Sequence, residues 1–83
     1  MTYKEFKKEI EELGLRYKFY DDVVSVCLIN SYCSIAAIFV KHRYSGIIEF
    51  DSSLSDSKYN KLLYLCCELM QTPLDERGEP NDI

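Results

Sequence analysis

The chain has 83 residues, of which 47% are hydrophobic and 29% are charged, with three glycines and two prolines. This length and composition fit one small globular domain and exclude a disordered, collagenous or two-domain protein. The formal net charge is −4, but the segment 71–83 carries −3 of it and residues 1–70 only −1, so the body lacks the basic surface that binds nucleic acids.

The N-terminus is charged and lacks the apolar segment of a secretory signal. No apolar run reaches the roughly 20 residues that a membrane span needs, and the longest one, 35–40, has the length of a strand. We therefore expect a protein of the cytoplasm with no membrane partner. So short a chain hides only about 60% of its unfolded surface on folding, so a second subunit would help to stabilise it.

Thr2 and Glu5 have the spacing of a capping box and predict a helix that begins at Tyr3. Its buried side chains recur at i, i+4 and i+7: Phe6, Ile10 and Leu13. Gly14 supplies the left-handed position that follows a helix.

Four segments then have the alternation or the β-branched content of strands: 15–20, 23–29, 34–40 and 44–50. The polar segments between them suit turns: Asp21-Asp22, Asn30-Ser31-Tyr32 and Lys41-His42-Arg43. Because every connection is short, the strands should form an antiparallel meander.

A second helix follows a polar loop, with Ser55 or Asp56 as its cap and its end near Gln71. Its apolar stripe is the wider of the two: Tyr59, Leu62, Leu63, Cys66, Leu69 and Met70. The predicted fold is therefore α+β in the order αββββα, with both helices packed on one face of the sheet.

Residues 1–71 form the predicted domain, and residues 72–83 form an acidic C-terminal tail. Thr72-Pro73-Leu74-Asp75 has the pattern of a second helix start, with Thr72 as its cap and Pro73 as its first residue, and predicts one turn. Beyond Arg77, glycine, proline and acidic residues are typical of a mobile chain end.

The titratable residues do not form a pattern that predicts catalysis. The four cysteines have spacings unlike those of a zinc site and are expected to be free thiols, with Cys66 packed as a small apolar group: Cys27, Cys33, Cys66 and Cys67. His42 is the only histidine and lies in a turn, without a partner that the sequence identifies. Glu49, Asp51 and Asp56 lack the glycine and the terminal glutamate of a calcium loop. We therefore expect no metal, no cofactor and no enzymatic activity.

The two central strands are apolar on both faces, although two helices can cover only one face of a sheet. Either another molecule covers the second face, or the sheet curls and the tail folds beneath it. The residues that we expect to bind a partner are three tyrosines near turns or strand ends, two sheet residues and two acidic residues of the tail: Tyr20, Tyr32, Tyr44, Ile38, Val40, Asp75 and Glu76.

The order of elements, followed by Thr72-Pro73-Leu74-Asp75-Glu76-Arg77, resembles small proteins encoded by bacteriophages and prophages of Gram-positive bacteria. In those proteins a helix, a short β meander and a second helix precede such a segment. The resemblance implies a phage accessory protein that works in a bacterial host cell, and it supplies no catalytic residues.

Two functions are therefore considered. The first is a non-enzymatic accessory protein that binds and inhibits a host or antiviral-defence protein, with an anti-CRISPR-like inhibitor as its sharpest form. The alternative is a homodimeric structural protein whose apolar sheet faces pack together. A nucleic-acid partner is not expected, since Lys41-His42-Arg43 is an isolated basic turn.

Overall fold

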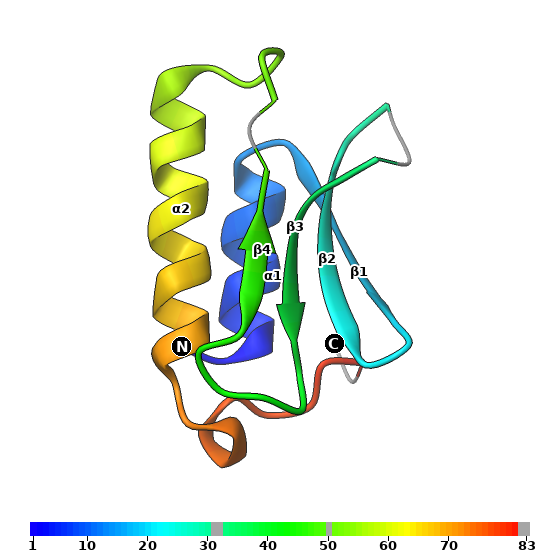
Figure 1. Cartoon of the computed structure of the whole chain (residues 1–83). Helices are drawn as coiled ribbons and strands as arrows, with labels where there is room; N and C mark the ends of the chain where they lie inside the picture. The colour runs from blue at the N-terminus through cyan, green and yellow to red at the C-terminus, as the bar shows by residue number, and fades with distance from the viewer. Residues whose placement is uncertain (31–32, 50, 82–83) are drawn as a thin grey trace.

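The computed structural model describes residues 1–30, 33–49 and 51–81 and has the predicted α+β order (Figure 1). The elements are α1 (Tyr3–Glu12), β1 (Leu15–Tyr20), β2 (Val23–Leu28), β3 (Ser34–Phe39), β4 (Gly46–Ile48), α2 (Asp56–Gln71) and a short 3-10 turn, η1 (Leu74–Glu76). The strands form one antiparallel sheet in the order β1-β2-β3-β4. The meander and its two helices are thus confirmed.

Both helices pack against the same face of the sheet. One cluster of buried side chains joins α1, α2 and the strands, and its members include Phe6, Ile10, Leu15, Val24, Val26, Ala36, Ile38, Leu62, Leu65 and Leu69. Cluster residues on neighbouring strands lie opposite one another in the strand register, as Val24 of β2 and Ile38 of β3 do. Burial of these apolar side chains is the main force that holds the layers together.

The predicted capping box closes the N-terminus of α1. The backbone N–H of Glu5 donates to Thr2 Oγ1 over 3.1 Å, and the N–H of Thr2 donates to Glu5 Oε1 over 2.9 Å. At the other end Gly14 has φ +79°, the left-handed conformation expected there.

Helix α2 is capped by Ser55, whose hydroxyl accepts a hydrogen bond from the N–H of Lys58. Its buried face differs from the predicted stripe at two leucines, because Leu63 is 42% exposed and Leu65 is buried. The helix lies against α1 as well as against β3 and β4. This two-sided packing buries the flank that carries Leu65 and leaves Leu63 outside.

The last two strands correct the predicted pattern. Ala36 pairs with Val26 but Ser34 pairs with Cys27, so Ile35 is the extra residue of a β-bulge and turns into the helix-side core instead of following Ala37. β4 covers only Gly46–Ile48 instead of 44–50. Tyr44 has φ +62°, which interrupts the extended backbone before the strand can begin.

Thr72 ends α2 and does not cap the turn that follows, which corrects the predicted helix start. Its hydroxyl donates to the carbonyl of Glu68 over 2.8 Å and accepts a hydrogen bond from the N-terminal amine of Met1 over 3.0 Å. The turn η1 has no side-chain cap. The predicted single turn is present, at Leu74–Glu76.

The tail lies against the body of the protein because Arg77 is fully buried. Its guanidinium donates to the carbonyls of Thr72 and Met70 over 2.9 and 3.1 Å and to the hydroxyl of Tyr3 over 3.3 Å. The backbone is also joined, since the N–H of Tyr3 donates to the carbonyl of Arg77 over 2.7 Å. No ion pair within the described residues includes Arg77, so the negative end of the α2 dipole is what compensates its charge.

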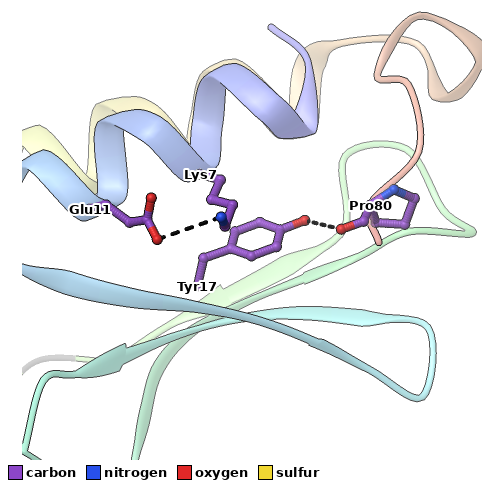
Figure 2. Close-up of polar contacts among 4 residues, drawn as sticks. All are labelled: Lys7, Glu11, Tyr17 and Pro80. Carbon is purple, nitrogen blue, oxygen red and sulfur yellow. Dashed lines mark hydrogen bonds and ion pairs between the residues drawn. The ribbon is translucent and has the colours of Figure 1, made fainter. Parts of the chain in front are cut away.

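The tail runs along the helix side of the sheet. Figure 2 shows the side chain of Tyr17 between α1 and the sheet, with its hydroxyl donating to the carbonyl of Pro80 over 2.8 Å. Lys7 and Glu11 form a surface ion pair of 3.7 Å above it. Beyond Arg77, residues 78–81 line a hollow with Phe19 and Val40.

Candidate functional site: the turn end and the open face

Two surfaces of the molecule follow from this architecture. The first is the end of the sheet where the β1–β2 turn, the β3–β4 turn and the tail come together (Figure 1). We call it the turn end and define it by Tyr20, Tyr44, Asp75 and Glu76. The second is the face of the sheet opposite the helices, which we call the open face.

The two turns of the turn end are tied to each other. Asp21 and Asp22 have φ +58° and +63°, the left-handed pair that closes a two-residue hairpin between β1 and β2. Lys41 of the next turn forms a 3.0 Å ion pair with Asp22, and the N–H of Val40 donates to the Asp22 carbonyl over 3.1 Å. These contacts hold the two hairpins in register at this end.

The β3–β4 turn is also fixed to the C-terminus of α2. Arg43 donates to the carbonyl of Gln71 from Nε over 2.9 Å and from Nη2 over 2.6 Å. The N–H of Tyr44 donates to the carbonyl of Met70 over 3.0 Å, the same oxygen that accepts from Arg77. Two arginines therefore satisfy the carbonyls that end α2, one from the turn and one from the tail.

Tyr44 is held in a conformation that a bulky side chain rarely adopts. Its φ is +62°, and its ring lies 4.5 Å from the Arg43 guanidinium carbon. The ring is nevertheless 65% exposed. A left-handed conformation at a non-glycine residue costs about 1 kcal/mol or more, and here the surrounding hydrogen bonds impose it and direct an aromatic ring to the surface.

Four of the seven residues expected to bind a partner lie at the turn end. Tyr20 is 82% exposed at the end of β1, and Tyr44 is exposed in the second turn. Asp75 and Glu76 are exposed on η1, which is linked through Arg77 to the same Met70 carbonyl as Tyr44. Tyr32 lies outside the described residues.

Ile38 and Val40 are not on the open face, and the burial of Ile38 corrects its assignment to a partner surface. Ile38 is fully buried in the cluster beneath the helices, and Val40 is half-buried against that cluster. The alternation of a strand sends their side chains to the helix side and Phe39 to the other. On β3, the apolar residues of the open face are therefore Ala37 and Phe39.

The open face consists of three rows of residues that lie side by side in the strand register. The row nearest the turns is Tyr20, Val23 and Phe39, and the middle row is Lys18, Ser25, Ala37 and Ile47. The third row is Arg16, Cys27 and Ser34, and it ends at Glu49, whose N–H donates to the carbonyl of the bulge residue Ile35. Ile47 is 53% exposed. None of these residues belongs to the helix-side cluster, and both helices and the tail lie on the other side within the described part of the chain.

The centre of this face is shallow because its residues are small. Ala37, Ile47 and Glu49 line a hollow of about 120 Å³ together with Ser34 and the backbone of the bulge. Cys27 is buried at 3% exposure although it is outside the helix-side cluster. Among the described residues of this face, the charged ones lie at the two edges of the sheet, with Arg16 and Lys18 on β1 and Glu49 beyond β4.

A third surface feature lies at the opposite end of the molecule. A hollow of about 610 Å³ is lined by apolar side chains from α1, β1, β2 and the loop before α2, with Lys58 and two serines at its rim. Its apolar members are Leu13, Leu15, Leu28, Ile29 and Leu54.

The cysteines and acidic residues have structural environments. All four cysteines are free thiols, as expected. Cys66 is fully buried, and burial raises the pKa of its thiol from 9.0 to about 12. The carboxylate of Asp51 accepts from the N–H and hydroxyl of Ser53, which lowers its pKa. Among the residues that the structure describes, no three histidine, cysteine or acidic side chains are grouped to hold a metal ion.

Comparisons with protein-family models, with curated proteins and with solved structures give no match for this chain. Among the described residues, no helix has both the length and the apolar character that crossing a membrane requires. A proposal for the function therefore depends on the fold and its surfaces.

Sequence reasoning missed three features of these surfaces. The sequence does not predict the burial of Arg77, because charged residues are seldom fully buried. The bulge at Ile35 changed which residues share a face, and the sequence 34–36 contains no glycine to mark it. The left-handed Tyr44 precedes Ser45 and Gly46, a weak turn signal that could have shortened the predicted strand.

Proposed function

We propose that this protein acts by binding another protein through its turn end, without catalysing a reaction. The observation that carries the proposal is Tyr44, an exposed aromatic side chain that two hairpin turns, a helix end and the tail together hold in a left-handed conformation. Strain of this kind persists only where its surroundings impose it, and it is concentrated at functional sites.

The chemistry of the turn end suits a protein partner. Tyrosine has a large apolar ring and a polar hydroxyl, and it is among the residues most enriched at the centres of interfaces. Tyr20 and Tyr44 supply two such rings, and Asp75 and Glu76 add negative charge at the same end of the molecule. A partner with a basic rim around an apolar pocket would match this arrangement, because opposite charges accelerate and orient association.

The sharpest form of the proposal is an inhibitor of an antiviral-defence protein, carried by a phage and related in action to anti-CRISPR proteins. The segment 72–77 supports this form, because it resembles a segment of small phage-encoded proteins. In this chain that segment also has a structural role, since Thr72 ends α2 and Arg77 joins the tail to Tyr3. The segment therefore sets the position of the turn end.

Partner capture with matched variants tests the binding role. The tagged chain is used as bait in a bacterial lysate, the captured protein is identified by mass spectrometry, and its dissociation constant is measured with the purified partner. Tyr44→Ala should weaken binding at least about tenfold, as loss of an interface anchor does. Tyr64→Ala, at a 58% exposed tyrosine on α2, should leave the dissociation constant unchanged.

Equal binding by the wild type, Tyr20→Ala and Tyr44→Ala would overturn the turn end as the contact surface. The inhibitory form has its own assay, in which the chain is expressed in bacteria whose CRISPR system restricts a targeted phage. Plaque formation should rise with the wild-type chain and fall back with Tyr44→Ala. Unchanged plaque numbers would refute the inhibitory form. The binding role would then be tested by partner capture alone.

A further inference from the structure

We propose that a second copy of this chain covers the open face, in a dimer whose two-fold axis runs parallel to the strands. The inference goes beyond the proposed function, because it concerns the open face of the sheet, which shares only Tyr20 with the turn end. It rests on the distribution of charge and side-chain size over the three rows of the open face.

A two-fold axis along the strands places β1 of one copy opposite β4 of the other, and β2 opposite β3. Each row then faces the same row of the partner in reverse order. Arg16 and Glu49 are at the two ends of one row, so the axis brings each arginine to a glutamate of the other copy, twice in the dimer. Isologous interfaces require this kind of self-complementarity.

The remaining positions match in the same arrangement. Val23 faces Phe39 of the other copy, Ser25 faces Ala37, and the aliphatic stem of Lys18 covers Ile47, an exposed residue of the middle row. The small side chains at the centre allow the two sheets to approach to the ~10 Å that face-to-face packing needs. No like charges meet.

The other face-to-face arrangement is less favourable. An axis across the strands would place β1 on β1 and would bring Lys18 of each copy against Lys18 of the other, since it is in the middle row. It would also leave Glu49 without a basic residue opposite. Like charges directly opposed are destabilising, so the distribution of charge favours the axis along the strands.

This geometry has a consequence for the turn end. An axis along the strands leaves the direction of every strand unchanged, so the turn ends of both copies lie at the same end of the dimer. The dimer would present two copies of Tyr44, Asp75 and Glu76 on one side. A partner with two equivalent sites would bind such a dimer more tightly than a single copy, through effective concentration.

The area of the open face determines how stable the dimer should be. Four strands about 4.8 Å apart and about 20 Å long present roughly 400 Å² per copy in projection. Stable interfaces bury about 800 Å² per partner. The dimer should therefore be weak and dependent on concentration.

Sedimentation velocity of the full chain tests the dimer between about 10 μM and about 1 mM, where interfaces of this size dissociate. The wild type should shift from monomer to dimer across this range. Arg16→Glu and Glu49→Arg should each weaken dimerisation at least about tenfold, because each places two pairs of like charges in contact. The double variant Arg16→Glu/Glu49→Arg should dimerise again.

Matched controls carry the same charge changes on the helix side. Lys4→Glu and Glu12→Arg alter exposed residues of α1 and should dimerise as the wild type does. A wild type that is monomeric at every concentration would overturn the inference, and so would a double variant that remains monomeric while circular dichroism shows it folded. Dimerisation of Arg16→Glu and of Glu49→Arg as strong as that of the wild type would also overturn it, because the copies would then associate elsewhere.

The two proposals fail separately. A monomeric wild type that still binds a partner through Tyr44 removes the dimer and keeps the proposed function. If the double variant dimerises again but Tyr44→Ala binds the partner with an unchanged dissociation constant, the dimer is kept and the turn end is removed as the contact surface.

Discussion

The guanidinium of Arg77 donates a hydrogen bond to the hydroxyl of Tyr3 over 3.3 Å, and so joins residues 74 positions apart in the sequence. The guanidinium carbon also lies 6.0 Å from the centre of the Tyr3 ring. The same side chain satisfies two carbonyls at the end of α2. One residue of the tail thereby fastens the first turn of α1 to the last turn of α2.

Replacing Arg77 with methionine should destabilise the fold by about 3 kcal/mol or more. Methionine fills much of the space, but the buried Tyr3 hydroxyl and the part-buried Thr72 carbonyl lose their donor, and the loss of a donor in a buried place costs about 1–3 kcal/mol. Urea unfolding measures the change. Glu76→Gln, at the exposed neighbour, should shift the free energy of unfolding by less than about 0.5 kcal/mol. Equal stability of the two variants would contradict the role of Arg77.

Gly46→Ala should also destabilise the protein, although the residue is exposed. A Cβ at this position would come within 2.6 Å of Met70 Sδ and 2.8 Å of the Ala37 carbonyl oxygen, and the backbone oxygen cannot move aside. Overpacking of this kind costs about 1–3 kcal/mol. Gly78→Ala is not a matched control because its φ is +78°, so Ser45→Ala serves instead. A Gly46→Ala melting curve that overlies the wild-type curve would disprove the close approach.

Tyr44→Gly should separate stability from binding. Glycine adopts a φ of +62° without the cost that tyrosine bears, so the free energy of unfolding should stay constant or rise by up to about 1 kcal/mol, less the loss of the stacking on Arg43. Tyr44→Gly should weaken partner binding as much as Tyr44→Ala does. Thermal unfolding and the binding assay check the two effects. A loss of more than about 1 kcal/mol would show that the tyrosine ring stabilises the turn and that its conformation carries little strain.

The buried thiol of Cys66 predicts a loss of stability at alkaline pH. Burial raises its pKa from 9.0 to about 12, so above pH 9 the unfolded chain releases a proton that the folded chain retains. Ionisation then favours unfolding, by at most about 1.4 kcal/mol per pH unit for this group. Burial also raises the pKa of Tyr17 above its ordinary value of 10.0, which adds to the effect at still higher pH.

Urea unfolding of the wild type and of Cys66→Ala at pH 7.5, 9 and 10 isolates this contribution. The alanine variant should be less stable at neutral pH because of the cavity it leaves, but the difference from the wild type should narrow as the pH rises from 9 to 10. Two stability curves that stay parallel over this interval would contradict the raised pKa.

The local elements of this protein could be predicted from its sequence because their signals are local. Thr2 and Glu5 mark the start of α1 through hydrogen bonds that span three residues, and the alternation of 15–20 ends at Asp21 and Asp22, where β1 ends. Ser55 was one of two proposed caps of α2 and is the one that accepts the N–H bond. The order of strands follows from short connections.

Tertiary contacts decided everything that depends on which side chains meet. Packing of both helices on one face puts Ile38 under the helices and leaves Phe39 on the open face, and the bulge turns Ile35 to the helix side, because register depends on the neighbouring strands and not on residue type. Arg77 is buried only because α2 ends where its carbonyls can accept from a guanidinium, and Tyr44 is left-handed only because Met70 and Gln71 anchor its turn. Short-range hydrogen bonds and periodicity are written into consecutive residues, whereas these contacts join residues far apart in the chain and form only when the layers pack.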